Sequence, residues 1–249
     1  MITIENYFSK ENSLKYMGCS QFKDFMNCPK MAMAKINSDY VMPMTDALLM
    51  GKYFDAYFEG ELEQFKTDYP QIFKRDGNLK STYEKLNDII KLIETDPIFM
   101  KYNMGRQQVI YTGNIVGVPF KIMIDSLCEN CIVDRKLMAD FKDKYSDGEF
   151  KEWFRHWQYD IQGAIYQFVT LLNLGKKLPF LLAPATKEKS PDHDLIVLGD
   201  DILTPALEIV QYYAPRFQRI KLGLDPAIGC GVCDYCKSIK KCKEPILLG

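Results

Sequence analysis

The chain has 249 residues and a mass of 28.9 kDa, which is enough for one domain of ordinary size with its own core. Hydrophobic residues make up 47% and charged residues 26%, without repeats or low-complexity runs, which argues against a disordered chain and a solenoid. The net charge of −1 excludes a uniformly basic DNA-coating protein, although 32 lysines and arginines can still line a channel. Since the N-terminus lacks a signal-peptide pattern and no stretch is long and apolar enough to span a membrane, we expect a cytoplasmic protein.

A first helix is expected from about residue 20 to residue 34, with Phe22 and Phe25 on its apolar face. Pro29 lies inside this pattern and predicts a kink or a restart, because proline lacks a backbone donor and clashes with the preceding turn. The break would leave Cys28 at an irregular point, where its thiol can reach a partner outside the core.

A second helix is expected from about residue 45 to residue 60 and carries Gly51 and Asp55 one turn apart on one face. The glycine would let this helix approach a sheet closely, and Asp55 would point the same way. An aspartate is a suitable ligand for Mg²⁺ or Mn²⁺. Glu59, one further turn along, is the competing acid, and a solvated role for both acids is the alternative.

After an amphipathic helix at about residues 81–94, two strands are expected at residues 106–112 and 115–125. Gly113 and Asn114 predict the turn between them. A third strand follows, so the centre of the chain is expected to be an antiparallel meander of three strands.

The second and third of these strands carry the most informative pattern. Apolar and polar residues alternate through residues 117–125 and again through residues 131–136, which is the period of a pleated strand. A two-residue turn at Glu129 and Asn130 would place Asp125 directly opposite Asp134.

Opposed carboxylates repel each other unless a cation lies between them, so this register predicts a site for a hard divalent ion such as Mg²⁺ or Mn²⁺. Lys136 projects from the same face as Asp134, where it could orient or deprotonate a water or neutralise charge on a phosphate. The alternative is a polar hairpin face with an ion pair between Asp134 and Lys136.

A long helix is expected at about residues 150–173, with Gln162 and Tyr166 one turn apart and offset from its apolar stripe. An amide and a phenol are suitable uncharged partners for phosphate oxygens, although an ordinary helix flank would look the same. Strands at residues 178–186 and 195–198 and a last helix at residues 203–222 complete the chain ahead of its tail.

Four of the eight cysteines lie close together in the tail, and cysteines in a cytosolic protein serve soft metals more often than disulfides. Two compositions are open besides no metal at all. One is a local zinc site of Cys230, Cys233, Cys236 and Cys242; the other replaces Cys230 by Cys28.

Asp125 followed by Asp134-Arg135-Lys136 resembles the PD-(D/E)xK nuclease signature. The order of the motifs along the chain is also informative, since Gly51-x-x-x-Asp55 precedes this pattern and Gln162-x-x-x-Tyr166 follows it. With Cys28-Pro29 near the start and the clustered cysteines at the end, the chain resembles the RecB-like branch of that superfamily, and particularly the phage RecE-like (exodeoxyribonuclease VIII type) exonucleases. The resemblance covers roughly residues 20–243.

The resemblance implies an α/β fold of the α+β, restriction-endonuclease-like kind, with a central mixed sheet that contains the meander and is flanked by helices. Residues 1–222 would form the nuclease-like domain. Residues 223–249 would form a cysteine-clamped tail that packs on the N-terminal helix region.

The resemblance also implies roles for single residues. Asp125, Asp134 and Asp55 would hold Mg²⁺ or Mn²⁺, although relatives often have a histidine where Asp55 stands. Lys136 would position the attacking water, and Gln162 and Tyr166 would contact the DNA backbone or position that water. The cysteines would bind a [4Fe-4S] cluster, with Cys230 spare and structural Zn²⁺ as the alternative; the ligands expected for the cluster are Cys28, Cys233, Cys236 and Cys242.

The expected function is a metal-dependent DNA exonuclease in phage-type recombination or DNA end processing. Its partners would be single- or double-stranded DNA ends, with a single-strand annealing protein and an oligomer both compatible with the resemblance. Two alternatives remain: a catalytically silent member of the fold that binds DNA or a protein partner, and a CRISPR-adaptation-type single-strand nuclease.

Overall fold

The computed structural model describes residues 2–146 and 149–241. The chain divides into two compact units. Residues 1–42, 114–120 and 211–249 form the first unit, and residues 43–113 and 121–210 form the second. This division differs from the predicted one at residue 222, because the long helix α10 (Asp200–Lys221) contributes residues to both units.

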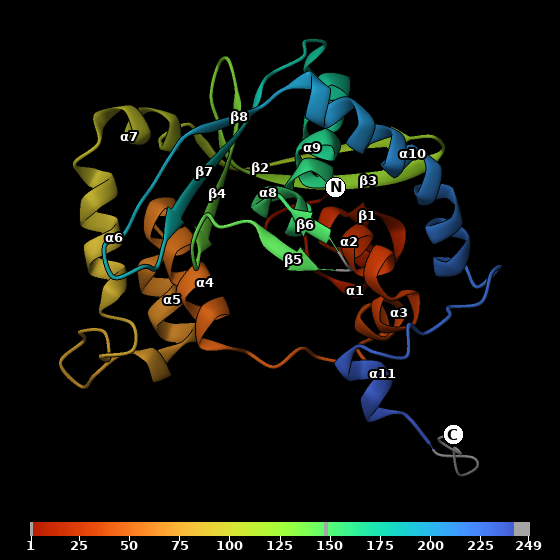
Figure 1. Cartoon of the computed structure of the whole chain (residues 1–249), viewed down its shortest axis with the longest axis horizontal. Helices are drawn as coiled ribbons and strands as arrows, with labels where there is room; N and C mark the ends of the chain where they lie inside the picture. Colours follow the sequence, from red (N-terminus) through yellow and green to blue (C-terminus); the bar gives the residue numbers. More distant parts are fainter. Residues whose placement is uncertain (1, 147–148, 242–249) are drawn as a thin grey trace. The chain divides into compact units, whose positions relative to one another are not determined.

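A six-stranded mixed sheet has the strand order β1-β3-β4-β7-β8, with β2 paired to β3 (Figure 1). The β3–β4 and β7–β8 pairs are antiparallel and the β4–β7 pair is parallel, so the mixed sheet is confirmed. The strands are β1 (Met17–Gly18), β2 (Arg106–Ile115), β3 (Val118–Leu127), β4 (Ile132–Met138), β7 (Phe180–Thr186) and β8 (Ile196–Leu198).

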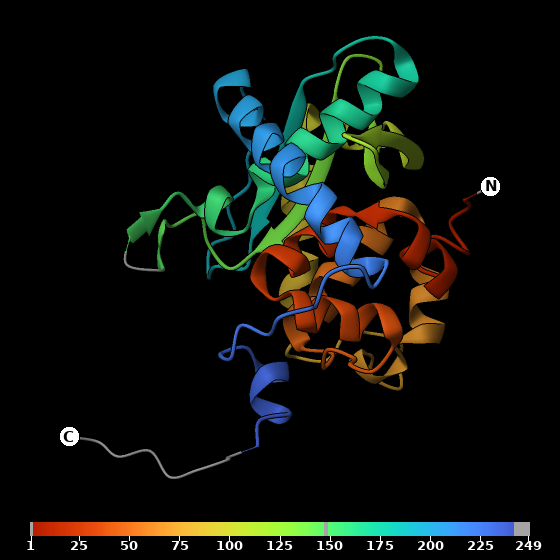
Figure 2. The same ribbon diagram turned by 90° about the vertical axis from the view of Figure 1, so that its right-hand side faces the viewer.

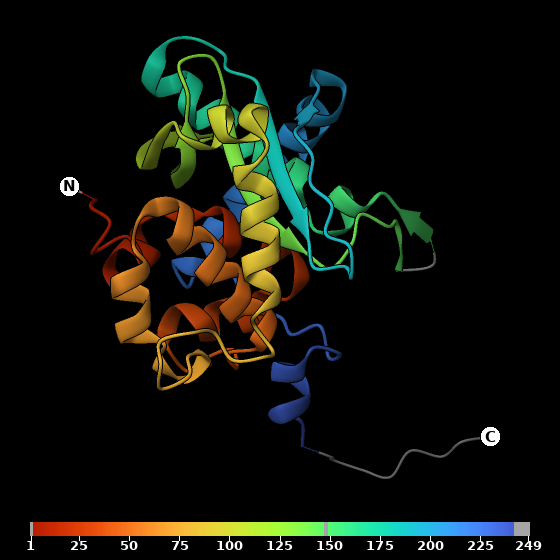
Figure 3. The same ribbon diagram turned by 90° about the vertical axis from the view of Figure 1, so that its left-hand side faces the viewer.

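In the second unit, helices cover both faces of the sheet. One face packs against the four helices drawn in orange to yellow in Figure 3, where Val133 and Leu181 join their apolar core. The opposite face packs against α9 (Tyr159–Leu174), seen in Figure 2, at a point where Gly163 meets Phe180. The helices on the first of these two faces are α4 (Asp46–Glu59), α5 (Leu62–Asp68), α6 (Lys85–Glu94) and α7 (Pro97–Asn103), with the 3₁₀ turn η1 (Pro70–Ile72) between α5 and α6.

Among its described residues, the first unit contains four short helices and the end of α10. Phe25 stacks on Phe217 at a centroid separation of 5.2 Å, which packs α2 against α10. Cys28 has an extended backbone (φ −163°, ψ 101°) and Pro29 is the first residue of the next helix, so the predicted restart is confirmed. The helices are α1 (Lys10–Lys15), α2 (Cys19–Asn27), α3 (Pro29–Asn37) and α11 (Asp234–Ser238).

The predicted turn at Gly113 and Asn114 is wrong, because β2 continues to Ile115. The chain turns instead at Val116 and Gly117, which both have positive φ (46° and 84°), as the tight turns of twisted hairpins require. Gly113 has a packing role, since a Cβ there would lie 2.9 Å from Leu172 of α9.

The helix predicted over residues 150–173 is interrupted. A short hairpin of β5 (Lys144–Ser146) and β6 (Glu149–Lys151) precedes α8 (Trp153–His156). Gln158 then adopts a left-handed conformation (φ 54°) directly before α9, which ends the continuity of the apolar stripe. None of the helices in the described ranges is long and apolar enough to cross a membrane.

Candidate active site and cysteine cluster

The hairpin of β3 and β4 brings the two predicted acids together. The ladder pairs Ser126 with Val133, so the next residues along the strands are Asp125 and Asp134, as predicted. At this point the Arg135 N–H donates to the Asp125 side chain, with 2.9 Å between N and Oδ2. The sheet thus fixes the Asp125 carboxylate beside the start of the Asp-x-Lys segment.

Asp134 is 1% exposed and lies between an amide and an ammonium group. Gln162 Nε2 donates to Asp134 Oδ1 at 2.6 Å, and Lys136 Nζ lies 2.5 Å from Asp134 Oδ2. Burial by itself would lower the pKa of Lys136, but the Asp134 and Asp125 carboxylates outweigh it and raise that pKa above its usual value. Lys136 is therefore an ammonium ion at neutral pH, a form that can donate hydrogen bonds but cannot accept a proton.

Gln162 and Tyr166 both point from α9 toward the hairpin and both are buried. The Gln162 amide bonds to Asp134, and the Tyr166 hydroxyl donates to the Met123 carbonyl oxygen at 3.0 Å. Their hydrogen bonds in the structure are thus to the protein, where they tie α9 to β4 and β3.

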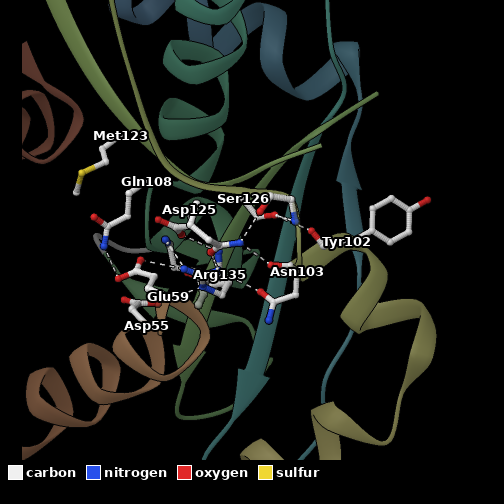
Figure 4. Close-up of polar contacts among 12 residues, drawn as sticks. Asp55, Glu59, Tyr102, Asn103, Gln108, Met123, Asp125, Ser126 and Arg135 are labelled. Atoms are coloured by element: carbon white, nitrogen blue, oxygen red, sulfur yellow. Dashed lines mark hydrogen bonds and ion pairs between the residues drawn. The ribbon is translucent and has the colours of Figure 1, made fainter. Parts of the chain in front are cut away.

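Arg135 is the central residue of a polar network that the sequence analysis missed (Figure 4). Its side chain is fully buried, and Nη2 donates to Glu59 Oε1 at 2.9 Å. Nη1 donates to Asn103 Oδ1 at 3.2 Å and to Gln107 Oε1 at 2.7 Å. A signal was present in the sequence, because Arg135 lies two residues from both Val133 and Leu137 and therefore on the same, apolar face of β4. A charge on such a face needs a buried partner.

An irregularity in β2 supplies two side chains to this network. Gln108 has a left-handed φ of 50°, which is strained for a residue with a Cβ and breaks the normal alternation of strand side chains. As a result Gln107 bonds to Arg135, while the adjacent Gln108 Nε2 donates to Glu59 Oε2 at 2.6 Å. Glu59, expected as the competitor of Asp55, is thus held by two partners.

Asp55 lies beside Arg135, with Oδ1 3.7 Å from Arg135 Nε, and its side chain is 44% exposed. Desolvation and the nearby Asp125 carboxylate raise the pKa of Asp55 to about 8, against the opposing influence of Arg135 and Lys136. The three acids of the prediction therefore belong to one electrostatic neighbourhood. The expected role of Gly51 is wrong, because a Cβ there would meet nothing within 4 Å and the glycine allows no close approach.

Asp55, Asp125 and Asp134 offer the hard oxygen donors that suit Mg²⁺ or Mn²⁺. The mutual repulsion evident at Asp55 is the kind that a cation relieves, so the donor set fits such an ion chemically. Their oxygens do not all lie within 4.8 Å of one another; in the described part of the chain only a cysteine set meets that criterion.

The cysteine set consists of Cys28, Cys230, Cys233 and Cys236, all in the first unit. Their sulfurs lie within 4.8 Å of one another, and the Cys28 and Cys236 sulfurs are 3.6 Å apart. Cys242, a member of both predicted compositions, lies outside the described residues. The set combines Cys28 of one composition with Cys230 of the other, together with Cys233 and Cys236, which both share. The local reason is the turn at residues 230–236, where the N–H groups of Cys233 and Cys236 point at the sulfurs three residues earlier.

The ionisation of these thiols is uneven. The N–H groups of Val232 and Cys233 lower the pKa of Cys230 to about 6, whereas burial raises the pKa of Cys233 to about 12. All four cysteines this close together would become thiolates only with a cation between them, because metal binding displaces the thiol protons.

A family model described as a PDDEXK-like domain of unknown function (DUF3799) matches residues 18–239. The chain belongs to this family. Among solved structures, this PDDEXK-like domain is similar to a protein from Eubacterium rectale named "Putative exonuclease", whose crystal structure was determined at 2.19 Å. The two chains are 41% identical with a TM-score of 0.94, over 99% of this chain and 96% of the other. No curated protein matches the sequence.

The hairpin carries all three residues that the sequence analysis matched to the PD-(D/E)xK signature: Asp125, Asp134 and Lys136. The predicted restriction-endonuclease-like fold is confirmed by the mixed sheet with helices on both faces and by the family match.

Proposed function

We propose that the protein is a metal-dependent nuclease that hydrolyses the phosphodiester bonds of DNA from an end. The observation that carries this proposal is the buried Asp134 carboxylate, held by Gln162 and Lys136 directly beside Asp125. The family match and a 41% identical relative named "Putative exonuclease" support the same activity. DNA end processing or phage-type recombination is the cellular role that the proposal favours.

The chain would supply three functions to this reaction. Asp55, Asp125 and Asp134 would hold Mg²⁺ or Mn²⁺, which acts as a Lewis acid on the scissile phosphate. Lys136, charged at neutral pH, would orient the attacking water through an N–H donor and stabilise negative charge developing on the phosphate. Gln162 keeps the Asp134 carboxylate in one orientation.

The test is digestion of DNA by wild-type protein, by Asp134→Asn and by Lys136→Met, with Mg²⁺ or Mn²⁺. Linear end-labelled DNA should be degraded by the wild type and by neither of these two variants, and covalently closed circular DNA should resist. Lys74→Gln, which removes a surface ion pair with Glu84, is a matched control and should cleave normally. Binding of DNA ends without cleavage by the wild type would instead indicate a catalytically silent member of the family, and cleavage of circles would contradict an exonuclease.

The cysteine set is proposed to hold one structural metal ion, with Zn²⁺ the best fit. Zinc–sulfur bonds of about 2.3 Å in a tetrahedron place the four sulfurs about 3.8 Å apart. The sulfur separations in the set, 3.6 Å for one pair and at most 4.8 Å for any, fit that geometry. A [4Fe-4S] cluster binds its cysteines through four separate irons and would need them further apart.

Metal analysis of the purified protein tests this assignment. We expect stoichiometric zinc in the wild type and its loss in Cys230→Ser. Cys242→Ser is the matched control, since a set of Cys28, Cys230, Cys233 and Cys236 is complete without it, and it should retain the zinc. A brown protein with iron, inorganic sulfide and broad absorbance near ~400 nm would contradict a zinc site.

A further inference from the structure

Arg135 occupies the variable position between Asp134 and Lys136, yet its guanidinium is the most completely buried charge near the acids, with its side chain 0% exposed. A buried cation is costly unless it is paired and hydrogen-bonded. Glu59 provides the pairing at 2.9 Å, and Asn103 and Gln107 accept from the other terminal nitrogen. These three partners fix the plane of the guanidinium.

One donor of this group remains without a hydrogen bond. Arg135 Nε is buried and has no partner within hydrogen-bond distance. The nearest carboxylate oxygen is Asp55 Oδ1, 3.7 Å away, which is an ion pair but too long for a hydrogen bond. Because a buried N–H without a partner is destabilising, a small inward shift of the half-exposed Asp55 side chain toward Arg135 Nε is favoured.

The main chain of the same residue serves the second acid. The Arg135 N–H donates to Asp125 Oδ2 at 2.9 Å, so one residue contacts the carboxylates of both α4 and β3. Each carboxylate has a second oxygen that this contact leaves for a cation. Carboxylates that bind metals are usually held in this way by hydrogen bonds from residues behind them.

We propose that Arg135 is a positioning residue that orients Asp55 and Asp125 for a divalent ion, with Glu59 as the counter-ion that keeps the guanidinium buried. The proposal rests on the proposed function of these two acids as metal ligands. The guanidinium is required for its geometry as well as its charge: two terminal nitrogens are anchored, and the third nitrogen is aimed at Asp55.

The affinity for Mn²⁺, measured by electron paramagnetic resonance without DNA, tests the proposal independently of cleavage. Arg135→Lys keeps the positive charge but loses the planar guanidinium with its three fixed nitrogens. This change should weaken Mn²⁺ binding about 10–100-fold. Arg106→Lys, the same change at an exposed arginine on β2, should leave the affinity unchanged. An unchanged affinity in folded Arg135→Lys would overturn the proposal.

A double-mutant cycle separates positioning from general stabilisation of the fold. If Arg135 acts through Asp55, then Arg135→Lys should weaken Mn²⁺ binding far less in an Asp55→Asn background than in the wild type. Fully additive effects would mean that Arg135 does not act through Asp55 and would overturn that part of the proposal.

If Arg135→Lys does not fold, the double variant Glu59→Leu/Arg135→Met removes both buried charges together, which proteins often tolerate. Its Mn²⁺ affinity should still fall by about 10–100-fold, and wild-type affinity would overturn the proposal. A wild type that binds Mn²⁺ through Arg135-dependent acids but cleaves no DNA would leave this inference standing and refute the nuclease. If instead the wild type cleaves DNA and Arg135→Lys binds Mn²⁺ with wild-type affinity, the nuclease assignment would stand and the role of Arg135 would be refuted.

Discussion

Two lysines of the central hairpin show how surroundings set the charge of a side chain. Lys136 faces two carboxylates, which hold its pKa above the usual value despite burial. Lys121 on β3 is 3% exposed, and desolvation lowers its pKa to about 8. The surroundings of Lys136 stabilise its charged form, whereas those of Lys121 destabilise it.

Lys121→Met should therefore stabilise the protein at pH 7. Below pH 8 the folded state must bury a charged ammonium, a penalty of about 3 kcal/mol relative to the neutral form. Between about pH 8 and pH 10.5 the unfolded chain binds the proton and the folded protein does not, so wild-type stability gains a contribution that rises with pH. In denaturant unfolding, the variant should have the larger free energy of unfolding at pH 7, and the difference from the wild type should shrink toward pH 10. A difference that does not change with pH would contradict this account.

Tyr166→Phe distinguishes a structural phenol from one that contacts substrate. The hydroxyl bonds to the Met123 carbonyl, so its loss should cost about 1 kcal/mol and lower the unfolding temperature by about 2–4 °C. The KM for DNA should stay within twofold of the wild type. A large rise in KM with unchanged stability would show that Tyr166 leaves Met123 to bind the DNA backbone.

At the scale of elements, α9 is placed by close packing against β7 at Gly163. A Cβ at this position would lie 2.6 Å from Phe180 and 2.9 Å from Leu203. Since Gln162 is the adjacent residue, any displacement of α9 also moves the amide that holds Asp134.

Gly163→Ala should consequently destabilise the fold by about 1–3 kcal/mol and reduce the rate of DNA cleavage. Gly51→Ala is the matched control on α4, where a Cβ has open space around it. There the same change should stabilise the helix by about 0.5–1 kcal/mol, because alanine is the better helix former. The unfolding temperature should fall in Gly163→Ala and rise in Gly51→Ala, each relative to the wild type. A fall in both variants would mean that α4 packs more closely at Gly51.

At the scale of the whole molecule, the cysteine set closes a very long segment of chain. Cys28 and Cys236 are separated by 208 residues, and the other two cysteines lie on the same turn as Cys236. A metal bound there would link the helix pair α2–α3 to the tail within the first unit.

Removal of this metal should lower the stability of the first unit. Treatment with a strong zinc chelator is expected to reduce the unfolding temperature, and added Zn²⁺ should restore it, because the ion binds the folded chain in preference to the unfolded one. Cys28→Ser should start at the lower temperature and respond to neither reagent. An equal response in Cys28→Ser would show that the zinc binds elsewhere.

The sequence by itself determined the features that depend on neighbours along the chain. The period of two and the spacing across a two-residue turn were enough to predict the register of β3 and β4, in which Ser126 pairs with Val133 and the next residues are Asp125 and Asp134. The steric demands of Pro29 were enough to break the first helix. The strand register and the helix break both depend on backbone geometry within a few residues, and the residue pattern over such a short stretch is enough to predict them.

The tertiary structure alone decided what depends on contacts between distant segments. The sequence does not distinguish its glycines, but in the structure Gly113 packs against Leu172 of α9 and Gly163 of α9 packs against Phe180 of β7. Gly51 has no such neighbour. The partners of Arg135 come from α4, α7 and β2, and Cys230 joins Cys28 from the far end of the chain. Spacing along the sequence cannot reveal such partners, because packing selects them only after the sheet and its helices have assembled.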